Sequence, residues 1–220
     1  MKMLSKLVAL YRQCLAVGSL LLVSINVSAQ SVADMWISMP DDIVPYLTLN
    51  QKKEMIECDR IGVDSSVKNK LEGNTAIDTL SESYGKFLVS NSRSIQLVKL
   101  PTDNDSILLI IDTHLGPKAH SEASFYTLKW DKLSDEGRIP KLMLSDFVAR
   151  PDTMSVADYD CLISSVVPVF FQFDYDKTTE TLIVSPQMAI VTLEEKQRLE
   201  GLTSKQTLIW DKEVFIKVII

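Results

Sequence analysis

The chain has 220 residues, of which 46% are hydrophobic and 24% are charged, so it has enough apolar surface to bury a substantial core. This hydrophobic content excludes a disordered protein, which lacks the apolar surface needed to offset chain entropy. The 23 basic and 29 acidic residues give a formal net charge of −6, and this acidic balance argues against nucleic acid as a partner. With seven glycines and neither a P-loop nor a GxGxxG motif, the sequence also argues against a phosphate-binding backbone loop.

Residues 1–29 have the three-part pattern of a secretory signal peptide. The first twelve residues include Lys2, Lys6 and Arg12. An apolar run over 17–27 follows and ends in the short side chains of Val27-Ser28-Ala29. We predict cleavage between Ala29 and Gln30, and therefore a periplasmic or secreted protein. The alternative is an uncleaved membrane anchor, but a span needs about 20 apolar residues and this run is shorter. Cys14 precedes the apolar run, which argues against a lipoprotein anchor.

Cleavage at this point would leave a more acidic chain. The remaining residues include 20 basic and 29 acidic side chains, a net charge of −9. Docking on anionic lipid is therefore disfavoured. No second apolar segment is long enough for a transmembrane helix, so the mature chain is predicted to have none.

The first part of the mature chain predicts two helices. Residues 35–42 predict a short helix ended by Pro40, because a residue before proline is pushed out of the helical region. Asn50 is a candidate cap for a helix from Gln51 to Arg60, with Gly62 just beyond its end. Residues 63–73 predict a further turn or short helix.

From Ala76 onward the pattern changes to strands without an intervening helix. The predicted strands cover residues 81–90, 94–100, 107–111 and 124–130. The run 107–111 is continuously apolar, as is typical of a central strand that is covered on both faces. Consecutive strands of this kind predict an antiparallel meander.

The second half is predicted to repeat the order of helix and strand. Its helices cover 141–147, 155–166 and 193–199, and its strands cover 169–175, 181–184, 206–210 and 214–218. Thr192 and Glu195 form a capping box at the start of the third helix, and Pro168 ends the second.

A short internal echo supports two similar halves. The sequence Thr127-Leu-Lys-Trp-Asp-Lys132 recurs as Thr207-Leu-Ile-Trp-Asp-Lys212. Duplication and a shared preference for hairpin residues both explain it. We predict an α+β fold in which a helical lead is followed by antiparallel sheet, in two similar halves over 30–134 and 135–220.

The residues able to carry chemistry form no recognised motif. His114 and His120 flank a predicted loop and could bind zinc with Asp112 and Glu122, but their spacing matches no known zinc motif. The sequence contains no GxSxG, so a serine triad has no support. We predict no catalytic, cofactor-binding or metal-binding residue.

Two cysteines remain after the predicted cleavage. Cys58 and Cys161 either form a disulfide, which an exported compartment permits, or remain separate buried thiols. Spacing alone does not decide between these alternatives.

Large aromatic residues on the predicted strands are the candidates for a binding face. They are Trp130, Trp210, Phe171 and Tyr175. Packing in the core is the alternative, because large aromatic side chains are usually buried.

The segment from Met35 to Thr48, with its sequence MWISMPDDIVPYLT, resembles an uncharacterised family of exported proteins from Bacteroides-like bacteria. Ser124-Phe-Tyr followed by Trp130, and Thr192 to Lys196 followed by Trp210, are similar as well. That family is a domain of unknown function, so the resemblance implies export and a shared fold over about residues 32–216 and no site. The helix-then-strand halves are also similar to beta-lactamase inhibitor proteins and PepSY-like domains, which is a likeness of fold only.

Taken together, these patterns favour an exported protein that binds rather than catalyses. The leading hypothesis is a periplasmic module that recognises an envelope protein, a peptide or a glycan through a sheet face, without a cofactor. The first alternative is an envelope hydrolase with an unrecognised carboxylate or histidine site. The second is a structural component of a surface assembly.

Overall fold

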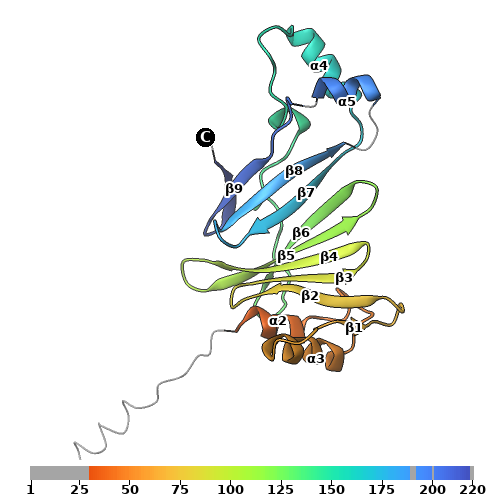
Figure 1. The fold of residues 1–220 in the computed structure, drawn as a ribbon. Coiled ribbons are helices and arrows are strands. Elements are labelled where there is room, and N and C mark those ends of the chain that lie inside the picture. The colour runs from red at the N-terminus through yellow and green to blue at the C-terminus, as the bar shows by residue number, and fades with distance from the viewer. Residues whose placement is uncertain (1–29, 189–191, 200, 219–220) are drawn as a thin grey trace, which may run out of the picture.

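The computed structural model describes residues 30–188, 192–199 and 201–218. The predicted leader, residues 1–29, lies outside these ranges. The described chain has an α+β fold with one antiparallel sheet of six strands and another of four. Helices α2 and α3 lie at one end of the molecule and α4 and α5 at the other, with the sheets between them (Figure 1). This arrangement confirms the predicted fold class, in which helices precede antiparallel sheet.

The six-stranded sheet is a meander in which each strand pairs with the next along the chain. Its strands are β1 (Val67–Lys68), β2 (Asn74–Leu80), β3 (Tyr84–Ser90), β4 (Arg93–Pro101), β5 (Ser106–Leu115) and β6 (Ala119–Thr127). Leu108 and Ile110 of β5 pack against the N-terminal helices. Leu109 and Ile111 pack against the second sheet. The prediction of a central strand over 107–111 with both faces covered is therefore confirmed.

Helices α2 (Val32–Ser38) and α3 (Leu49–Arg60) cover one face of this sheet. Each begins with a capping box, at Ser31 and Thr48, that satisfies backbone N–H groups of the first turn. The buried Trp36 ring of α2 stacks on Phe87 of β3 with 3.8 Å between the ring centroids. This contact joins the helical layer to the sheet.

The four-stranded sheet packs on the opposite face of the six-stranded sheet and has the order β10-β9-β8-β7. Its strands are β7 (Val169–Asp176), β8 (Thr181–Met188), β9 (Gln206–Asp211) and β10 (Val214–Lys217). Both sheets contribute to one core, which includes Phe125 from the first and Phe173 from the second. A smaller cluster beyond this core joins η1 (Leu144–Asp146), α4 (Val156–Ser165) and α5 (Leu193–Leu199).

Strand β7 crosses the face of the six-stranded sheet with one backbone edge turned toward it. The buried Gln96 side chain of β4 accepts a hydrogen bond from the Tyr175 N–H at 2.9 Å and donates one to the Phe173 carbonyl at 3.5 Å. The buried Ser121 hydroxyl of β6 accepts a bond from the Phe173 N–H at 2.9 Å. Side chains of the six-stranded sheet thus form hydrogen bonds with backbone groups at the edge of β7. Without them, these groups would need a further strand as a partner.

Some element predictions for the first half were wrong in detail. Of the two alternatives for residues 63–73, the structure has a turn at Lys70-Leu71 and no helix, and it adds β1, in which Val67 pairs with Thr75 of β2. The cap of α3 is Thr48 rather than Asn50, since the Thr48 hydroxyl accepts a bond from the Gln51 N–H. The sheet accordingly has six strands where four were predicted.

Two further differences concern residues after β5. Strand β6 ends at Thr127 rather than Trp130, because the Thr127 hydroxyl accepts bonds from the N–H groups of Lys129 and Asp131 and closes a turn. Trp130 has φ of 70° in this turn, whereas Trp210, its counterpart in the echo, lies within β9. The predicted helix over 141–147 is a single 3-10 turn, η1.

Candidate functional site

Three hollows surround the turn between β4 and β5. We name them the seam pocket, of about 480 Å³, the tail pocket, of about 990 Å³, and the tyrosine pocket, of about 260 Å³. Thr102, Asn104 and Ile107 line both the seam pocket and the tail pocket. Lys99 and Ser106 line both the tail pocket and the tyrosine pocket. The hollows are therefore adjacent around one turn, and together we call them the turn groove.

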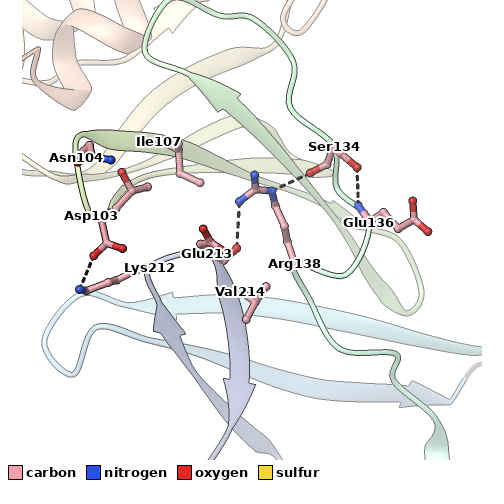
Figure 2. A pocket seen from close by; sticks show the side chains of 10 residues that line it. Asp103, Asn104, Ile107, Ser134, Glu136, Arg138, Lys212, Glu213 and Val214 are labelled. Carbon is pink, nitrogen blue, oxygen red and sulfur yellow. Dashed lines mark hydrogen bonds and ion pairs between the residues drawn. The ribbon is translucent and has the colours of Figure 1, made fainter.

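The seam pocket lies between the β4–β5 turn, the segment 134–138 and the β9–β10 turn (Figure 2). The Arg138 guanidinium donates from Nε to the Ser134 carbonyl at 2.8 Å and from Nη1 to the Glu213 carbonyl at 3.0 Å. The Lys212 ammonium of the second sheet pairs with the Asp103 carboxylate of the first. These contacts link the β9–β10 turn to the segment 134–138 and to the β4–β5 turn, and they give the pocket charged groups in its walls.

The tail pocket is the largest of the three and adjoins the first described residue. The Lys99 ammonium donates to the Gln30 carbonyl at 3.0 Å, which holds this residue at the wall. Most of the lining side chains carry hydroxyl, amide or charged groups: Thr102, Asn104, Asp105, Ser106, Thr127, Lys129 and Asp131. The pocket therefore presents both hydrogen-bond donors and acceptors.

The tyrosine pocket lies between the β2–β3 turn, the end of β4 and the β7–β8 turn. Its wall contains Tyr84 and Tyr175, whose rings stack with 6.0 Å between centroids. Burial, with a contribution from Glu180, raises the pKa of Tyr175 to about 12. Burial, with a contribution from Asp174, also raises the pKa of Tyr84. Both phenols are protonated near neutral pH, as an ordinary phenol is, and the raised pKa values extend this state to more alkaline solution.

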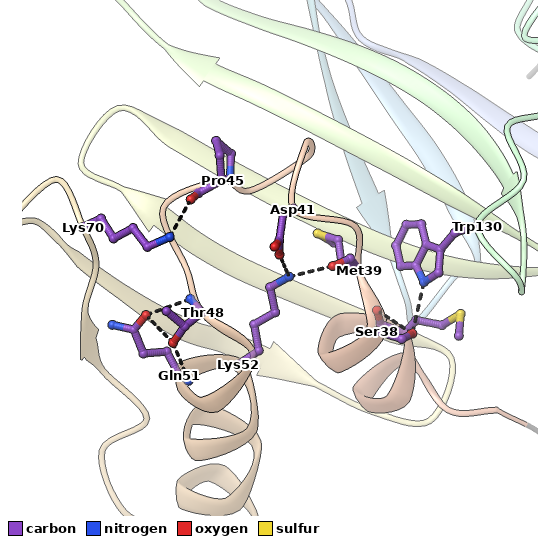
Figure 3. Close-up of polar contacts among 10 residues, drawn as sticks. Ser38, Met39, Asp41, Pro45, Thr48, Gln51, Lys52, Lys70 and Trp130 are labelled. Atoms are coloured by element: carbon purple, nitrogen blue, oxygen red, sulfur yellow. Dashed lines mark hydrogen bonds and ion pairs between the residues drawn. The ribbon is translucent and has the colours of Figure 1, made fainter.

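The four residues of the predicted binding face do not form one surface. Phe171, Tyr175 and Trp210 pack in the core between the sheets. Trp130 packs on the helical side of the first sheet, where its Nε1 donates to the Ser38 hydroxyl at 3.1 Å (Figure 3). Core packing thus accounts for most of their surface, and of the four only Tyr175 lines the turn groove.

The residues considered as zinc ligands occupy neighbouring positions on β5 and β6: Asp112, His114, His120 and Glu122. Arg93 binds both carboxylate oxygens of Asp112, at 2.8 and 2.6 Å. The His120 ring lies 5.3 Å from the ring of Phe170, while His114 is exposed beside Asp112. Within the described ranges, no three His, Cys, Asp or Glu side chains are placed to hold a metal ion.

The two cysteines are not joined. Cys58 on α3 is partly exposed, Cys161 on α4 is exposed, and both are free thiols. The two helices lie at opposite ends of the molecule (Figure 1). Of the two alternatives for this pair, the structure has separate thiols, although neither is fully buried.

Sequence reasoning did not find the turn groove. The range 101–105 carries a clear turn signal, but nothing local indicates that turns from the second sheet lie beside it. The charged residues of the β9–β10 turn lie between the predicted strands 206–210 and 214–218, and the sequence assigns them no further role. Their ion pair and hydrogen bonds to the other sheet depend on tertiary packing.

The fold places this chain in the class of α+β proteins with two packed antiparallel sheets, and turns of both sheets line the seam pocket. The sequence matches the family described as "Protein of unknown function (DUF3256)" over residues 24–215, and the chain belongs to that family. The predicted resemblance to a family of unknown function is confirmed to that extent. No curated protein matches the chain.

A solved structure also resembles this chain: a domain of an uncharacterized protein from Porphyromonas gingivalis W83. The TM-score is 0.72 at 21% sequence identity, over 87% of this chain and 100% of that one. At this identity the likeness shows a shared fold and does not define a function. Within the described part of the chain, no helix has the length and apolar character needed to cross a membrane.

Proposed function

We propose that this protein is an exported, non-catalytic binding module that holds an extended envelope polymer, a peptide or a glycan, in the turn groove. The observation that carries the proposal is the adjacency of three hollows around one turn, of which the seam pocket and the tyrosine pocket are lined by both sheets. Adjacent hollows around one turn suit a chain-like ligand, because successive units of the chain can occupy successive hollows. The turn groove replaces the sheet face as the proposed binding surface.

The composition of the groove supports binding over catalysis. Nucleophilic catalysis needs an activated nucleophile beside a base, most often a histidine. The residues that line the three hollows include neither histidine nor cysteine. Hydroxyl, amide and charged groups of this kind suit the recognition of peptide bonds or sugar hydroxyls.

The walls of the groove are fixed before a ligand arrives. Trp210 Nε1 donates to the Pro101 carbonyl at 2.7 Å, at the start of the β4–β5 turn. Arg138 and Lys212 join the same region across the seam. A preorganised surface loses less conformational entropy on binding, so modest polar contacts can give useful affinity.

Crosslinking from inside the groove tests the binding role. A photoreactive residue replaces Asn104, which is exposed and lines two of the hollows, or Asn91, which is exposed in the β3–β4 turn. In the native cells we expect an adduct with an envelope peptide or glycan from position 104 and none from position 91. Recovery of the ligand chemically intact supports a non-catalytic role. Identical adducts from both positions, or a cleaved ligand, would contradict the proposal.

Export is tested separately by the mass of the native protein. The apolar run and the Val27-Ser28-Ala29 end support cleavage before Gln30. We expect the protein in the envelope or secreted fraction with Gln30 as its first residue. A cytoplasmic protein that retains residues 1–29 would exclude an envelope ligand.

A further inference from the structure

The tyrosine pocket has an unusual balance of charge. Two lysines and two glutamates line it: Lys99, Lys177, Glu82 and Glu180. None of the four forms an ion pair with another residue in the described ranges. They come from the β2–β3 turn, the end of β4 and the β7–β8 turn, so three separate segments bring both signs of charge to one pocket.

This balance selects among ligands. A ligand with only a negative charge gains from the lysines but is repelled by the glutamates, and a cation meets the reverse situation. A ligand that carries both charges can interact favourably with both pairs. Attractive and like-charge contacts together can therefore discriminate between partners.

The size and wall of the pocket limit the ligand further. A hollow of about 260 Å³ accepts a group of amino-acid size rather than a whole oligomer. The Tyr175 ring, Val98 and Pro101 supply an apolar wall, and Ser83 and Ser106 supply hydroxyl groups beside it. The Tyr84 hydroxyl donates to Gln96 at 3.2 Å, so its ring has a fixed position.

We infer that the tyrosine pocket binds the zwitterionic head group of an α-amino acid, with its ammonium and carboxylate on one carbon. The head group belongs either to a free amino acid or to the end of a peptide linked through its side chain. The inference rests on the proposed function, because it names the group of the ligand that occupies one end of the turn groove. Lys99 and Lys177 bind the carboxylate, and Glu82 and Glu180 bind the ammonium.

Amide chemical shifts of the purified protein test this inference. L-alanine and γ-L-glutamylglycine both carry the head group, and the second adds a peptide extension. We expect both to shift the amide signals of Ser83, Tyr175 and Glu180. The Kd should be about 1 mM, as is typical of a small ligand with few contacts. N-acetyl-L-alanine lacks the ammonium and L-alaninamide lacks the carboxylate, and we expect each to bind about fivefold more weakly.

Two exposed substitutions on the β7–β8 turn provide the matched variants. Lys177→Ala and Glu180→Gln should each weaken binding of L-alanine about fivefold, since each removes one exposed ion pair between the protein and the ligand. Lys118→Ala, on the exposed β5–β6 turn, should leave binding unchanged. Tighter binding of γ-L-glutamylglycine than of L-alanine identifies the peptide end as the natural source, and the reverse identifies the free amino acid.

Equal binding of the capped and zwitterionic compounds would overturn the inference, as would the absence of shifts at the tyrosine pocket. If position 104 still crosslinks an envelope polymer in that case, the proposed function stands without the inference. If the head group binds but position 104 captures nothing, the proposed polymer is wrong and the pocket serves a free amino acid.

Discussion

Lys52 shows how a single buried charge can organise a loop. Its side chain is 1% exposed, and its ammonium donates to the Met39 carbonyl at 2.6 Å and to the Asp41 carboxylate at 3.4 Å (Figure 3). These bonds fix the segment between α2 and α3 against the second helix. A buried charge is tolerated only when such partners are present.

Lys52→Met should lower the free energy of unfolding by about 1–3 kcal/mol, because the Met39 carbonyl loses its partner in a buried position. Urea unfolding monitored by tryptophan fluorescence measures this change. Lys53→Met is the matched control, since Lys53 is exposed on the same helix and should change stability little. Equal effects of the two substitutions would contradict the structural role of Lys52.

Gly85 permits α2 to approach β3 closely. A Cβ atom at this position would lie 2.9 Å from Cγ1 of Val32 and 2.8 Å from the Phe87 ring. Gly85→Ala should therefore destabilise the protein by about 1–3 kcal/mol through overpacking, which thermal unfolding would detect. Gly116→Ala is the control, because the nearest atom to its Cβ is the Lys118 carbonyl oxygen at 3.7 Å. An unchanged midpoint for Gly85→Ala would show that α2 can move away without loss.

At the level of elements, the start of α2 depends on the Ser31–Asp34 capping box. The Asp34 N–H donates to the Ser31 hydroxyl at 3.2 Å, and the Ser31 hydroxyl donates to the Asp34 carboxylate at 2.7 Å. The side-chain and backbone hydrogen bonds from Ser31 lower the pKa of Asp34. A folded-state pKa below the unfolded value means that this contact stabilises the protein above the unfolded pKa. The contribution is lost as pH falls through the folded pKa.

Ser31→Ala should raise the pKa of Asp34 toward its ordinary value and lower stability at neutral pH by about 1 kcal/mol. The difference from the native protein should narrow as the solution is acidified, because the Asp34 carboxylate is then protonated in both. NMR titration of Asp34 and urea unfolding at several pH values measure the two effects. Ser164→Ala, on the exposed face of α4, serves as the control. If the pKa of Asp34 stays low in Ser31→Ala, a group other than the Ser31 hydroxyl lowers it, and the prediction is wrong.

The sequence predicted those elements whose signals are local. The continuous apolar run at 107–111 identified a central strand, and the capping box of Thr192 and Glu195 identified α5. Strands β1 and β2 were not among the predicted strands. β1 has only two residues, and β2 mixes polar and apolar side chains without strict alternation. Their pairing stabilises them only after the chain has folded back on β3.

At the level of the whole molecule, Gln96 connects the two sheets. Gln96→Met keeps the volume of the side chain but leaves the Tyr175 N–H without its acceptor. We expect a loss of about 1–3 kcal/mol and faster hydrogen exchange at the Tyr175 amide. Ser94→Ala is the control, as Ser94 is buried on the same strand and face. Unchanged exchange at Tyr175 would mean that the edge of β7 is stabilised by packing alone.

The candidate site could not be predicted to the same extent as the fold. Of the four aromatic residues proposed for a binding face, only Tyr175 lies at the turn groove, since hydrophobic surface draws large rings into the core. The groove includes exposed polar residues on turns, such as Asn104 and Lys212, which resemble any solvated loop in sequence. Their meeting depends on how one sheet packs over the other.

The shared core between the sheets also sets the order of events during synthesis. The ribosome releases the first sheet before the second, so Phe125 and the other residues of its second face have no partner until β7 to β10 have emerged. This core also includes Phe215 of β10, the last of the described strands in chain order. Until that residue is available, the nascent chain exposes a broad apolar surface that a holding chaperone can recognise.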